Sequence, residues 1–297
     1  MEPQPKNEIL LTGASGLLGQ AITSRLKSPW KALHHGEPGW DPENGICNPD
    51  LVKDSSAVIH LAGEPIAARR WSPKQKQKIY DSRVNGTRAL AEALAGLETK
   101  PECLICASAI GFYGNRGEEL LTENSPPGEG YLSKVVRDWE SAADPARQAG
   151  IRVVHLRLGM ILSAQGGALS KMLPPFKWGL GGKLGSGRMW MSWIHEQDAA
   201  RAFDYALTNP EISGALNLTA PRPVRNIEFT QTLAETLKKP AILPAPAFLI
   251  KALLGEMGEE LLLGSTRCPS EGLQKHKFDF RYQDLKSALN QLLRDEG

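Results

Sequence analysis

The hydrophobic positions near the start of the chain predict a strand, a turn and a helix in succession. Residues 9–11 form an unbroken apolar run, which is typical of a short buried strand. Glycines follow at positions 13, 16 and 19, and apolar residues then recur at helical spacing at positions 21, 22 and 26. A strand, a glycine-rich turn and a helix in this order form the first crossover of a nucleotide-binding α/β fold.

Each glycine in this turn has a physical role. One permits the tight turn, one lets the backbone approach a pyrophosphate, and one lets the helix pack closely on the strand. The free amides and the positive end of the helix dipole would hold the phosphates. The alternative is a surface turn that binds nothing. The residues predicted to cradle the pyrophosphate are Gly13, Ser15, Gly16, Leu17, Leu18 and Gly19.

Further apolar runs alternate with helical patterns along the chain. This alternation predicts a Rossmann-type, doubly wound parallel sheet with a smaller C-terminal substrate-binding region. We expect a dinucleotide-binding domain over residues 1–165, to which 193–220 return, and an active-site loop and substrate-binding region over 166–297. Further strands are expected at 30–33, 56–63, 103–108, 151–158 and 214–219, and a helix at 226–238 with Asn226 as its N-cap.

The ends of the second and third strands indicate how a cofactor would be held. At the second, His34 and His35 stand where an acid would favour NAD or an Arg would favour NADP. Their ring donors favour NADP(H), with NAD(H) possible, and place His35 near the adenosine phosphate; alternatively, both are solvated turn residues. After the third, Leu61, Ala62 and Gly63 resemble the LAG strand end of extended short-chain reductases. The resemblance implies that they lie along the ribose, where small residues allow close approach. His60 is expected to be a packed core histidine.

Composition and charge narrow the class of protein. The chain has 297 residues, 41% hydrophobic and 23% charged, with a formal net charge of +2 and no block of like charge. These values are ordinary for a soluble globular protein and suggest neither a nucleic-acid nor a membrane partner. There is no apolar run of membrane-spanning length and no signal peptide, so we expect a cytoplasmic monomer or homodimer.

The cysteines do not suggest a redox or metal centre. Cys103 and Cys106 have CxxC spacing but lie in a predicted strand, where residues three apart point to opposite faces. The two thiols should therefore diverge, and we expect no metal site.

Several motifs together resemble one known family. They are LTGASGLLG, HLAGEPIA, SAIGFYG, KMLPPFKWGLGGKLGSGR, SWIH and FDFRYQDLKSAL. With them, nearly the whole chain resembles the "epimerase family" subgroup of atypical extended short-chain dehydrogenase/reductases. The resemblance implies an NADP(H)-binding protein whose substrate is generally unassigned.

The resemblance also implies catalytic and binding roles. Ser108 would polarise a substrate carbonyl a few residues before Tyr113, a substrate-contact candidate; alternatively, Ser108 simply ends its strand. Tyr131 would be the general base, supported by Lys134, which stands three residues later where the family has four. Alternatively, Tyr131 and Lys134 are ordinary helix residues. Arg83 replaces an Asn and would place a cation near the cofactor, or form a salt bridge on a helix surface.

The stretch after the fifth predicted strand should complete the site. Leu158 and Gly159 are expected to line the nicotinamide side. In residues 166–192, glycines and prolines argue against a long regular element, while Met, Trp and Phe indicate a structured loop over the active site. Arg188 would there meet an anionic or polar substrate group. Asp198 is expected to be structural and to cap the helix that follows.

Two functions remain open from the sequence. The leading one is a short-chain reductase or epimerase-like oxidoreductase that uses NADP(H) on an unidentified small substrate. The other is a catalytically weak or inactive NADP(H)-binding sensor or regulatory protein. A nucleotide-sugar epimerase is less favoured, because the apolar KMLPPFKWG block suggests a smaller or more apolar ligand.

Overall fold

The structure is a computed structural model that describes residues 8–294. The chain divides into two compact units. Of these residues, unit 1 contains 8–108, 135–156 and 200–215, and unit 2 contains 109–134, 157–199 and 216–294.

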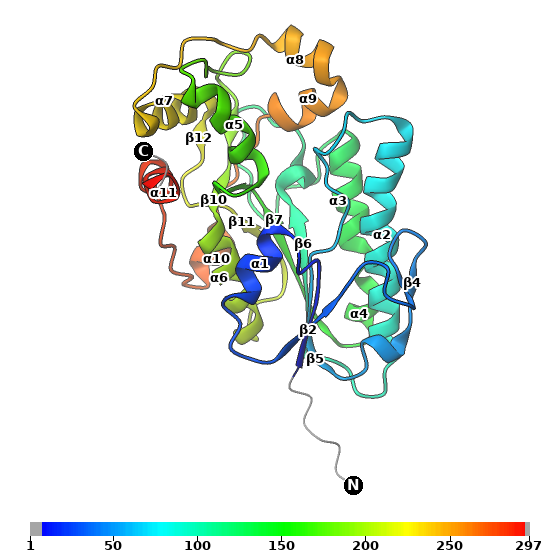
Figure 1. Cartoon of the computed structure of the whole chain (residues 1–297). Coiled ribbons are helices and arrows are strands. Elements are labelled where there is room, and N and C mark those ends of the chain that lie inside the picture. Colours follow the sequence, from blue (N-terminus) through cyan, green and yellow to red (C-terminus); the bar gives the residue numbers. More distant parts are fainter. Residues whose placement is uncertain (1–7, 295–297) are drawn as a thin grey trace. The chain divides into compact units, whose positions relative to one another are not determined.

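A six-stranded parallel sheet forms the centre of unit 1 (Figure 1). The last residues of β6, β7 and β11 belong to unit 2. Its strand order is β11-β7-β6-β5-β1-β2. The strands are β1 (Glu8–Thr12), β2 (Trp30–Leu33), β5 (Ser55–His60), β6 (Cys103–Ala109), β7 (Arg152–Leu158) and β11 (Gly214–Leu218). From β1 the chain first moves to β2 on one side and then to β5 on the other, so the carboxyl end of β1 is a topological switch point. The predicted Rossmann-type fold is confirmed.

Helices cover the sheet by burying apolar stripes. In Figure 1, α2 and α4 lie along one side of the sheet. Leu90 and Leu94 of α2 and Ala146 of α4 belong to one buried cluster with Leu10 and Leu104 of the strands. The helices that contribute residues to unit 1 are α1 (Leu17–Thr23), α2 (Pro73–Ala95), α3 (Tyr131–Ser141), α4 (Asp144–Gln148) and α6 (Glu196–Thr208). A hairpin of β3 (Trp40–Asp41) and β4 (Ile46–Cys47) and the 3-10 helix Pro49–Leu51 complete unit 1.

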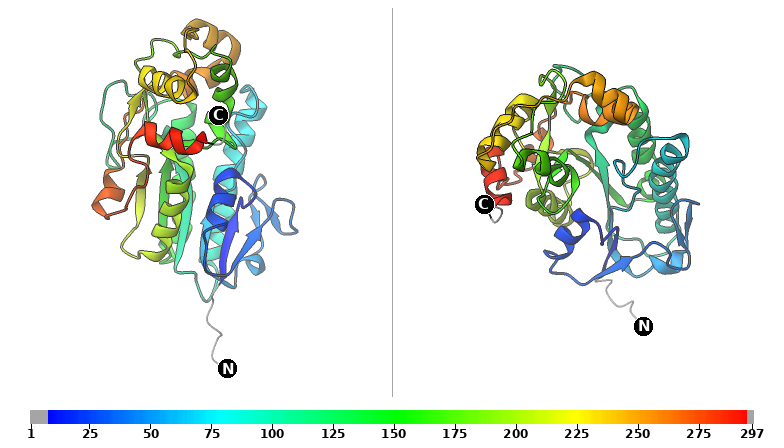
Figure 2. Two further views of the ribbon diagram at one scale, coloured as in Figure 1. Left: turned by 60° about the vertical axis from the view of Figure 1, so that its left-hand side comes forward. Right: turned by 45° about the horizontal axis from the view of Figure 1, so that its top comes forward.

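Unit 2 has a second core built mainly from helices. Leu173 of α5, Phe229 of α7 and Leu289 of α11 pack in one buried cluster with Trp193. Figure 2 shows these helices (green, yellow and red) near one another. The elements of unit 2 are the 3-10 helix Ile110–Tyr113, β8 (Met160–Leu162), α5 (Gly167–Lys177), β9 (Trp190–Met191), β10 (Trp193–His195), β12 (Val224–Arg225), α7 (Asn226–Leu237), α8 (Ala247–Leu254), α9 (Glu256–Leu262), α10 (Glu271–Lys275) and α11 (Leu285–Leu292).

The expectation that residues 166–192 hold no long regular element is wrong. Residues Gly167–Lys177 form α5, with Pro174 and Pro175 inside it. Leu169, Leu173 and Phe176 recur at helical spacing and are buried, so burial of this face outweighs the backbone hydrogen bonds that the two prolines remove. The rest of the segment bridges at Leu180 and Leu184 to residues 241 and 245.

Two polar side chains have partners that differ from the predicted caps. Asn226 is the first residue of α7 rather than its N-cap, and its side-chain oxygen accepts from the Leu184 N–H at 2.8 Å. The Asp198 carboxylate accepts from the N–H groups of Arg281 at 3.1 Å and Tyr282 at 2.9 Å. The expected structural role of Asp198 is confirmed, but it fixes a distant segment of the chain.

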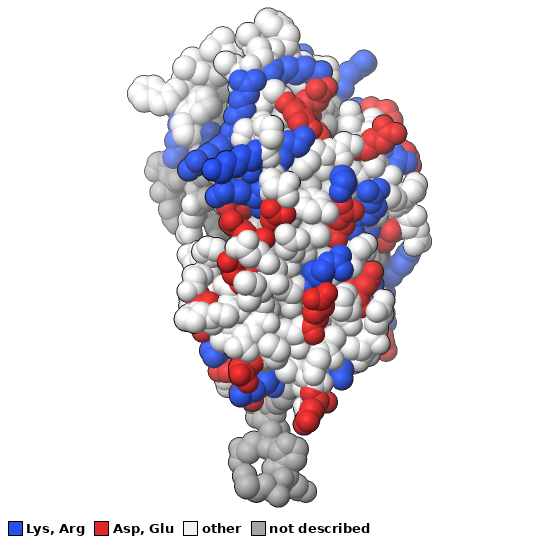
Figure 3. Space-filling model, turned by 90° about the vertical axis from the view of Figure 1, so that its right-hand side faces the viewer, with Lys and Arg blue, Asp and Glu red and all other residues white. Residues whose placement is uncertain are grey.

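Four further features concern membrane spans, metal ligands, cysteines and surface charge. Within residues 8–294, no helix is long and apolar enough to cross a membrane, and no three His, Cys, Asp or Glu side chains are grouped to hold a metal ion. Cys103 and Cys106 are buried and free. On the face drawn in Figure 3, acidic side chains lie among the basic ones.

Candidate functional site

A cavity of about 240 Å³ opens in unit 1 at the switch point of the sheet. Its walls are the segments that directly follow β1, β2 and β5, the β3–β4 hairpin and one residue of α2. Ligands of open parallel sheets bind at this position, outside the carboxyl ends of the strands. The residues that line it are Gly13, Ala14, Ser15, Leu33, His34, His35, Trp40, Pro42, Glu43, Ala62, Gly63, Glu64, Pro65 and Ser82.

The glycine turn touches the backbone after β5 at close range. Gly13 has φ +74°, and a Cβ on it would lie 2.9 Å from the amide nitrogen of Ala62. A Cβ on Gly19 would lie 2.3 Å from the Gly13 carbonyl oxygen, so α1 packs directly on the turn. These contacts explain why glycine is required at both positions. Leu18 is buried in the core, so of its groups only the backbone could face a ligand in the cavity.

Thr12 holds the end of β5 beside this turn. Its side-chain oxygen accepts from the N–H groups of Leu61 and Ala62, both at 3.2 Å. With both lone pairs used, the hydroxyl proton points to His60 Nδ1, 2.7 Å away. Nδ1 must therefore be an acceptor, which makes His60 the neutral tautomer with its proton on Nε2.

Through His60 this hydrogen-bond network reaches α2 and α3. Its Nε2 lies 2.9 Å from the Thr87 hydroxyl, which also accepts from Trp139 Nε1 at 2.9 Å. Burial lowers the pKa of His60 to about 4, and the positive charge of Arg83 acts in the same direction. The prediction that His60 is a packed core histidine is confirmed, since it is fully buried.

Arg83 lies under the loop that follows β5. Its Nη1 donates to the carbonyls of Glu64 at 2.8 Å and Ile79 at 3.3 Å, and the guanidinium lies 5.3 Å from the Trp139 ring centre. A Cβ on Gly63 would meet the guanidinium at 3.2 Å. Arg83 thus supports the loop backbone that lines the cavity. A direct contact between Arg83 and a cofactor stays a prediction.

Ser108, the candidate for polarising a carbonyl, has its proton engaged. Its hydroxyl donates to Glu140 of α3 at 2.6 Å, and the residue is buried. It could donate to a substrate only by giving up this bond. The catalytic role of Ser108 stays a prediction, and Glu140, 32 positions away in the chain, is a partner that the sequence did not suggest.

Tyr131 and Lys134 lie in unit 2, in the first turn of α3. The Glu260 carboxylate of α9 accepts from the N–H groups of Tyr131 and Leu132, both at 2.8 Å, and so caps the helix start. Positions three apart are neighbours on a helix surface, which keeps Lys134 on the same side as Tyr131. Their catalytic roles stay predictions.

Tyr113 is enclosed in unit 2. Its hydroxyl donates to Asn217 at 2.7 Å and accepts from Arg157 at 2.9 Å, and the side chain is fully buried. Burial raises the pKa of Tyr113. A direct substrate contact would require this side chain to leave its network, so that role stays a prediction. Leu158 and Gly159 follow Arg157, and a Cβ on Gly159 would lie 2.6 Å from the Ser192 carbonyl oxygen.

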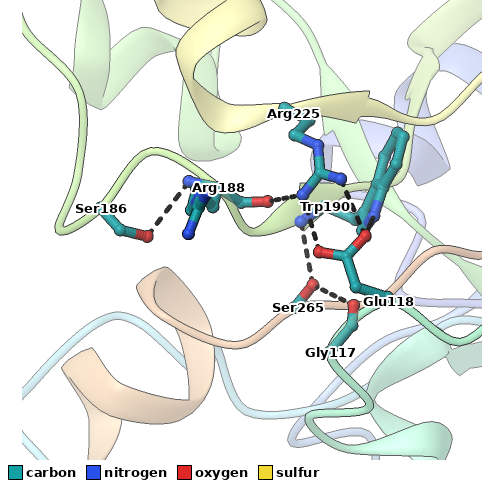
Figure 4. A network of polar contacts seen from close by, with 7 residues as sticks. All are labelled: Gly117, Glu118, Ser186, Arg188, Trp190, Arg225 and Ser265. Carbon is teal, nitrogen blue, oxygen red and sulfur yellow. Dashed lines mark hydrogen bonds and ion pairs between the residues drawn. The ribbon is translucent and has the colours of Figure 1, made fainter.

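Arg188 is exposed on a turn that its neighbours hold in place (Figure 4). Arg225 donates to the Arg188 carbonyl at 2.5 Å and forms a two-point ion pair with Glu118, each bond 2.8 Å. The Arg225 guanidinium also lies 4.4 Å from the Trp190 ring centre. Hydrogen bonds from Arg225 and Trp190 lower the pKa of Glu118 to about 2. The substrate role of Arg188 stays a prediction.

The structure thus brings one group of predicted residues together. Gly13, Ser15, His35, Ala62 and Gly63 line a single cavity in unit 1. Sequence reasoning missed the contribution of the β3–β4 hairpin to the same cavity. The missed lining residues that carry polar groups in their side chains are Trp40, Glu43, Glu64 and Ser82, whereas His34 was expected beside His35. Paired short strands gave too weak a periodic signal to reveal the hairpin.

A glycine turn and a cavity at the switch point of a parallel sheet define a Rossmann-type α/β protein. The chain belongs to the NAD dependent epimerase/dehydratase family, which matches residues 9–218, and residues 245–292 match a domain of unknown function, DUF1731. An epimerase family protein of Mycobacterium bovis is 40% identical over 95% of this chain and 96% of its own length. The chloroplastic epimerase family protein SDR39U1 homolog of Arabidopsis thaliana is 36% identical over 96% of this chain and 86% of its own length.

Solved structures are similar over the whole chain. The human epimerase family protein SDR39U1, isoform 2, solved with NADPH, has a TM-score of 0.85 and 28% identity, covering 97% of this chain and 99% of its own. The nucleoside-diphosphate sugar epimerase of Corynebacterium glutamicum has a TM-score of 0.79 and 35% identity over 96% of this chain, which spans 58% of the length of that protein. The resemblance to atypical extended short-chain reductases is confirmed.

The buried His60 network predicts a dependence of stability on pH. Because the pKa of His60 falls from 6.5 to about 4 on folding, the unfolded chain binds more protons between these values. The free energy of unfolding should therefore fall as the pH drops from 6.5 towards 4, by up to about 3 kcal/mol from this residue.

His60→Gln keeps an acceptor and a donor but does not titrate. Its free energy of unfolding, measured with urea, should therefore fall less steeply at acid pH. Equal acid losses in the two proteins would contradict this assignment. His34→Gln, at an exposed position, is the control and should keep the slope of the unaltered chain.

Proposed function

We propose that this chain binds NADP(H) in the cavity of unit 1 and acts as a reductase or epimerase-like oxidoreductase on a small substrate. The observation that carries the proposal is the turn at Gly13, which leaves no room for a side chain against Ala62 and faces a cavity between the ends of β1, β2 and β5. Membership of an NAD dependent family supports the cofactor class. The NADPH in the human relative supports NADP(H), and NAD(H) remains an alternative.

The residues of unit 1 fit a dinucleotide. The backbone of residues 13–19 is free of side-chain bulk at its three glycines and would hold the pyrophosphate through its N–H groups. Ala62 has only a methyl side chain and Gly63 has none, so a ribose could lie against the backbone at this wall of the cavity. His35, which is exposed at the cavity wall, would lie near the adenosine phosphate.

The remaining predicted residues would act on the substrate. The bound cofactor would supply or accept a hydride at its nicotinamide ring. Tyr131 would exchange a proton with the substrate, and Lys134 would favour the ionised form of Tyr131 by its positive charge. Ser108 would donate to a carbonyl after its proton turns from Glu140, and Arg188 would bind an anionic or polar group. We also propose that residues 166–297 supply the substrate side of the site.

A sensor or regulatory role is the second candidate, and one contact favours it. The Ser108 proton is already bonded to a carboxylate at 2.6 Å, so the group expected to polarise a carbonyl is occupied. A protein that binds NADP(H) without turnover would need neither Ser108 nor Tyr131 in reactive form.

The turn at Gly13 yields a direct binding prediction. In Gly13→Ala the new Cβ would push the turn away from Ala62, and we expect NADPH affinity to fall by about tenfold or more, equivalent to about 1.4 kcal/mol. Gly150→Ala is a matched control, because Gly150 has φ +86° and no atom within 4 Å of a Cβ. Both variants should lose about 1 kcal/mol of stability from backbone strain. Fluorescence titration with NADPH would refute the proposal if the two variants bound equally well, or if the unaltered chain did not bind at all.

Catalysis and sensing can be separated by one rapid-mixing measurement. The protein loaded with NADPH is mixed with a panel of aldehydes, ketones and nucleotide sugars, and the loss of NADPH absorbance is followed. For an enzyme, we expect oxidation with at least one compound and a loss of rate of about a hundredfold or more in Tyr131→Phe, since a general acid or base contributes about that much. Tight binding without oxidation by any compound would favour the sensor. Tyr80→Phe is the control, because Tyr80 is a helix residue bonded to Asp138.

A further inference from the structure

Two histidines and two acidic residues line the same cavity. His34 and His35 follow β2 directly and are exposed, while Glu43 comes from the hairpin and Glu64 from the loop after β5. The end of the second strand is where such folds read the adenosine ribose. The cavity wall therefore contains both carboxylates, which are negative, and imidazoles, which can become positive. In such folds this is the region where NAD and NADP differ.

The two cofactors differ there by one phosphate. A carboxylate accepts from the ribose 2′-hydroxyl of NAD, whereas a positive group binds the 2′-phosphate of NADP. Arg would be charged at every physiological pH, but an unperturbed imidazole has a pKa near 6.5 and changes its charge between about pH 5 and 8. With a histidine pair in this place, binding of the 2′-phosphate would depend on whether the imidazoles are protonated.

We propose that His34 and His35 set the preference for NADPH over NADH through their protonation, so that the preference rises as the pH falls towards 6. The inference rests on the proposed binding of NADP(H) in this cavity and adds how the 2′-position is read. With neutral imidazoles, the negative Glu43 and Glu64 side chains repel a phosphate and suit a ribose hydroxyl. With protonated imidazoles, the balance reverses and each ring can donate from both nitrogens.

The charged groups around the pair belong to several elements. Glu37 accepts from the His34 N–H at 3.2 Å in the turn after β2. In β3, hydrogen bonds from Asn44 lower the pKa of Asp41, and His35 contributes through its charge. Glu43 and Glu64 line the cavity, and the Glu64 carboxylate accepts from Gln75 Nε2 at 3.0 Å. Arg83 lies beneath Gly63. Among the described residues that line the cavity, His34 and His35 are the side chains that can carry a positive charge.

The test compares the affinities for the two cofactors across pH. Dissociation constants of NADPH and NADH are measured by fluorescence at pH 6, 7 and 8 and constant ionic strength. We expect the ratio of the NADH constant to the NADPH constant to increase about five- to tenfold from pH 8 to pH 6, as two exposed ion pairs would give. The 2′-phosphate itself loses charge near pH 6, which works against this rise.

Matched variants at the same two positions separate the effect of histidine protonation from that of protonation of the 2′-phosphate. The double variant His34→Gln/His35→Gln should bind NADPH more weakly and show no rise in the ratio at low pH. The double variant His34→Arg/His35→Arg should bind NADPH tightly at pH 8 as well as pH 6, so that only the phosphate titration remains. Glu43→Gln should weaken NADH binding and leave the pH slope in place. Circular dichroism checks that each variant is folded.

The outcomes distinguish this inference from the proposed function. If both cofactors bind and their ratio stays constant from pH 8 to pH 6, or if the Gln double variant keeps the slope of the unaltered chain, the inference is overturned while cofactor binding stands. If neither cofactor binds at any pH, the proposed function fails, and the inference fails with it.

Discussion

The site of this protein depends on a close contact between two backbone segments at the switch point of the sheet. The turn at Gly13 lies so near the end of β5 that a single added carbon would overlap the amide of Ala62. That contact requires glycine, a positive φ and a fixed end to β5. Because β2 diverges to the other side of β1, the same contact leaves a cavity between the three strand ends.

A buried chain of polar groups keeps this contact in register. Thr12 uses its oxygen to hold the two amides after β5 and its proton to reach His60, which continues through Thr87 to Trp139. Each hydrogen bond from Thr12 to Thr87 has one assigned donor and one acceptor. A second proton on His60, at Nδ1, would therefore break its bond with the Thr12 hydroxyl. Burying an imidazole costs free energy. In return, a polar network whose hydrogen bonds are all satisfied fixes one geometry, whereas apolar packing would allow several. The cavity wall is thus tied to α2 and α3, and the Ser108–Glu140 bond adds a second tie from the sheet to α3.

The fold was predictable from local patterns, because buried parallel strands are apolar runs and the turn glycines stand at fixed spacing. Contacts between distant residues were not predictable. Nothing near Tyr131 indicates that Glu260 would cap its helix, and nothing near Ser108 indicates Glu140. The hairpin that brings Glu43 into the cavity consists of two-residue strands with no readable period. In α5, the prolines gave a strong local signal, but burial of one helix face prevailed over it.

The central claim is that the strand ends of unit 1 form the cradle of a dinucleotide. Hydrogen–deuterium exchange, followed by mass spectrometry with and without saturating NADPH, tests it most directly. We expect exchange to slow in the peptides that cover residues 13–19 and 61–65, where backbone N–H groups would meet the cofactor. Unchanged exchange in both peptides under saturating conditions, with protection found only elsewhere, would contradict it.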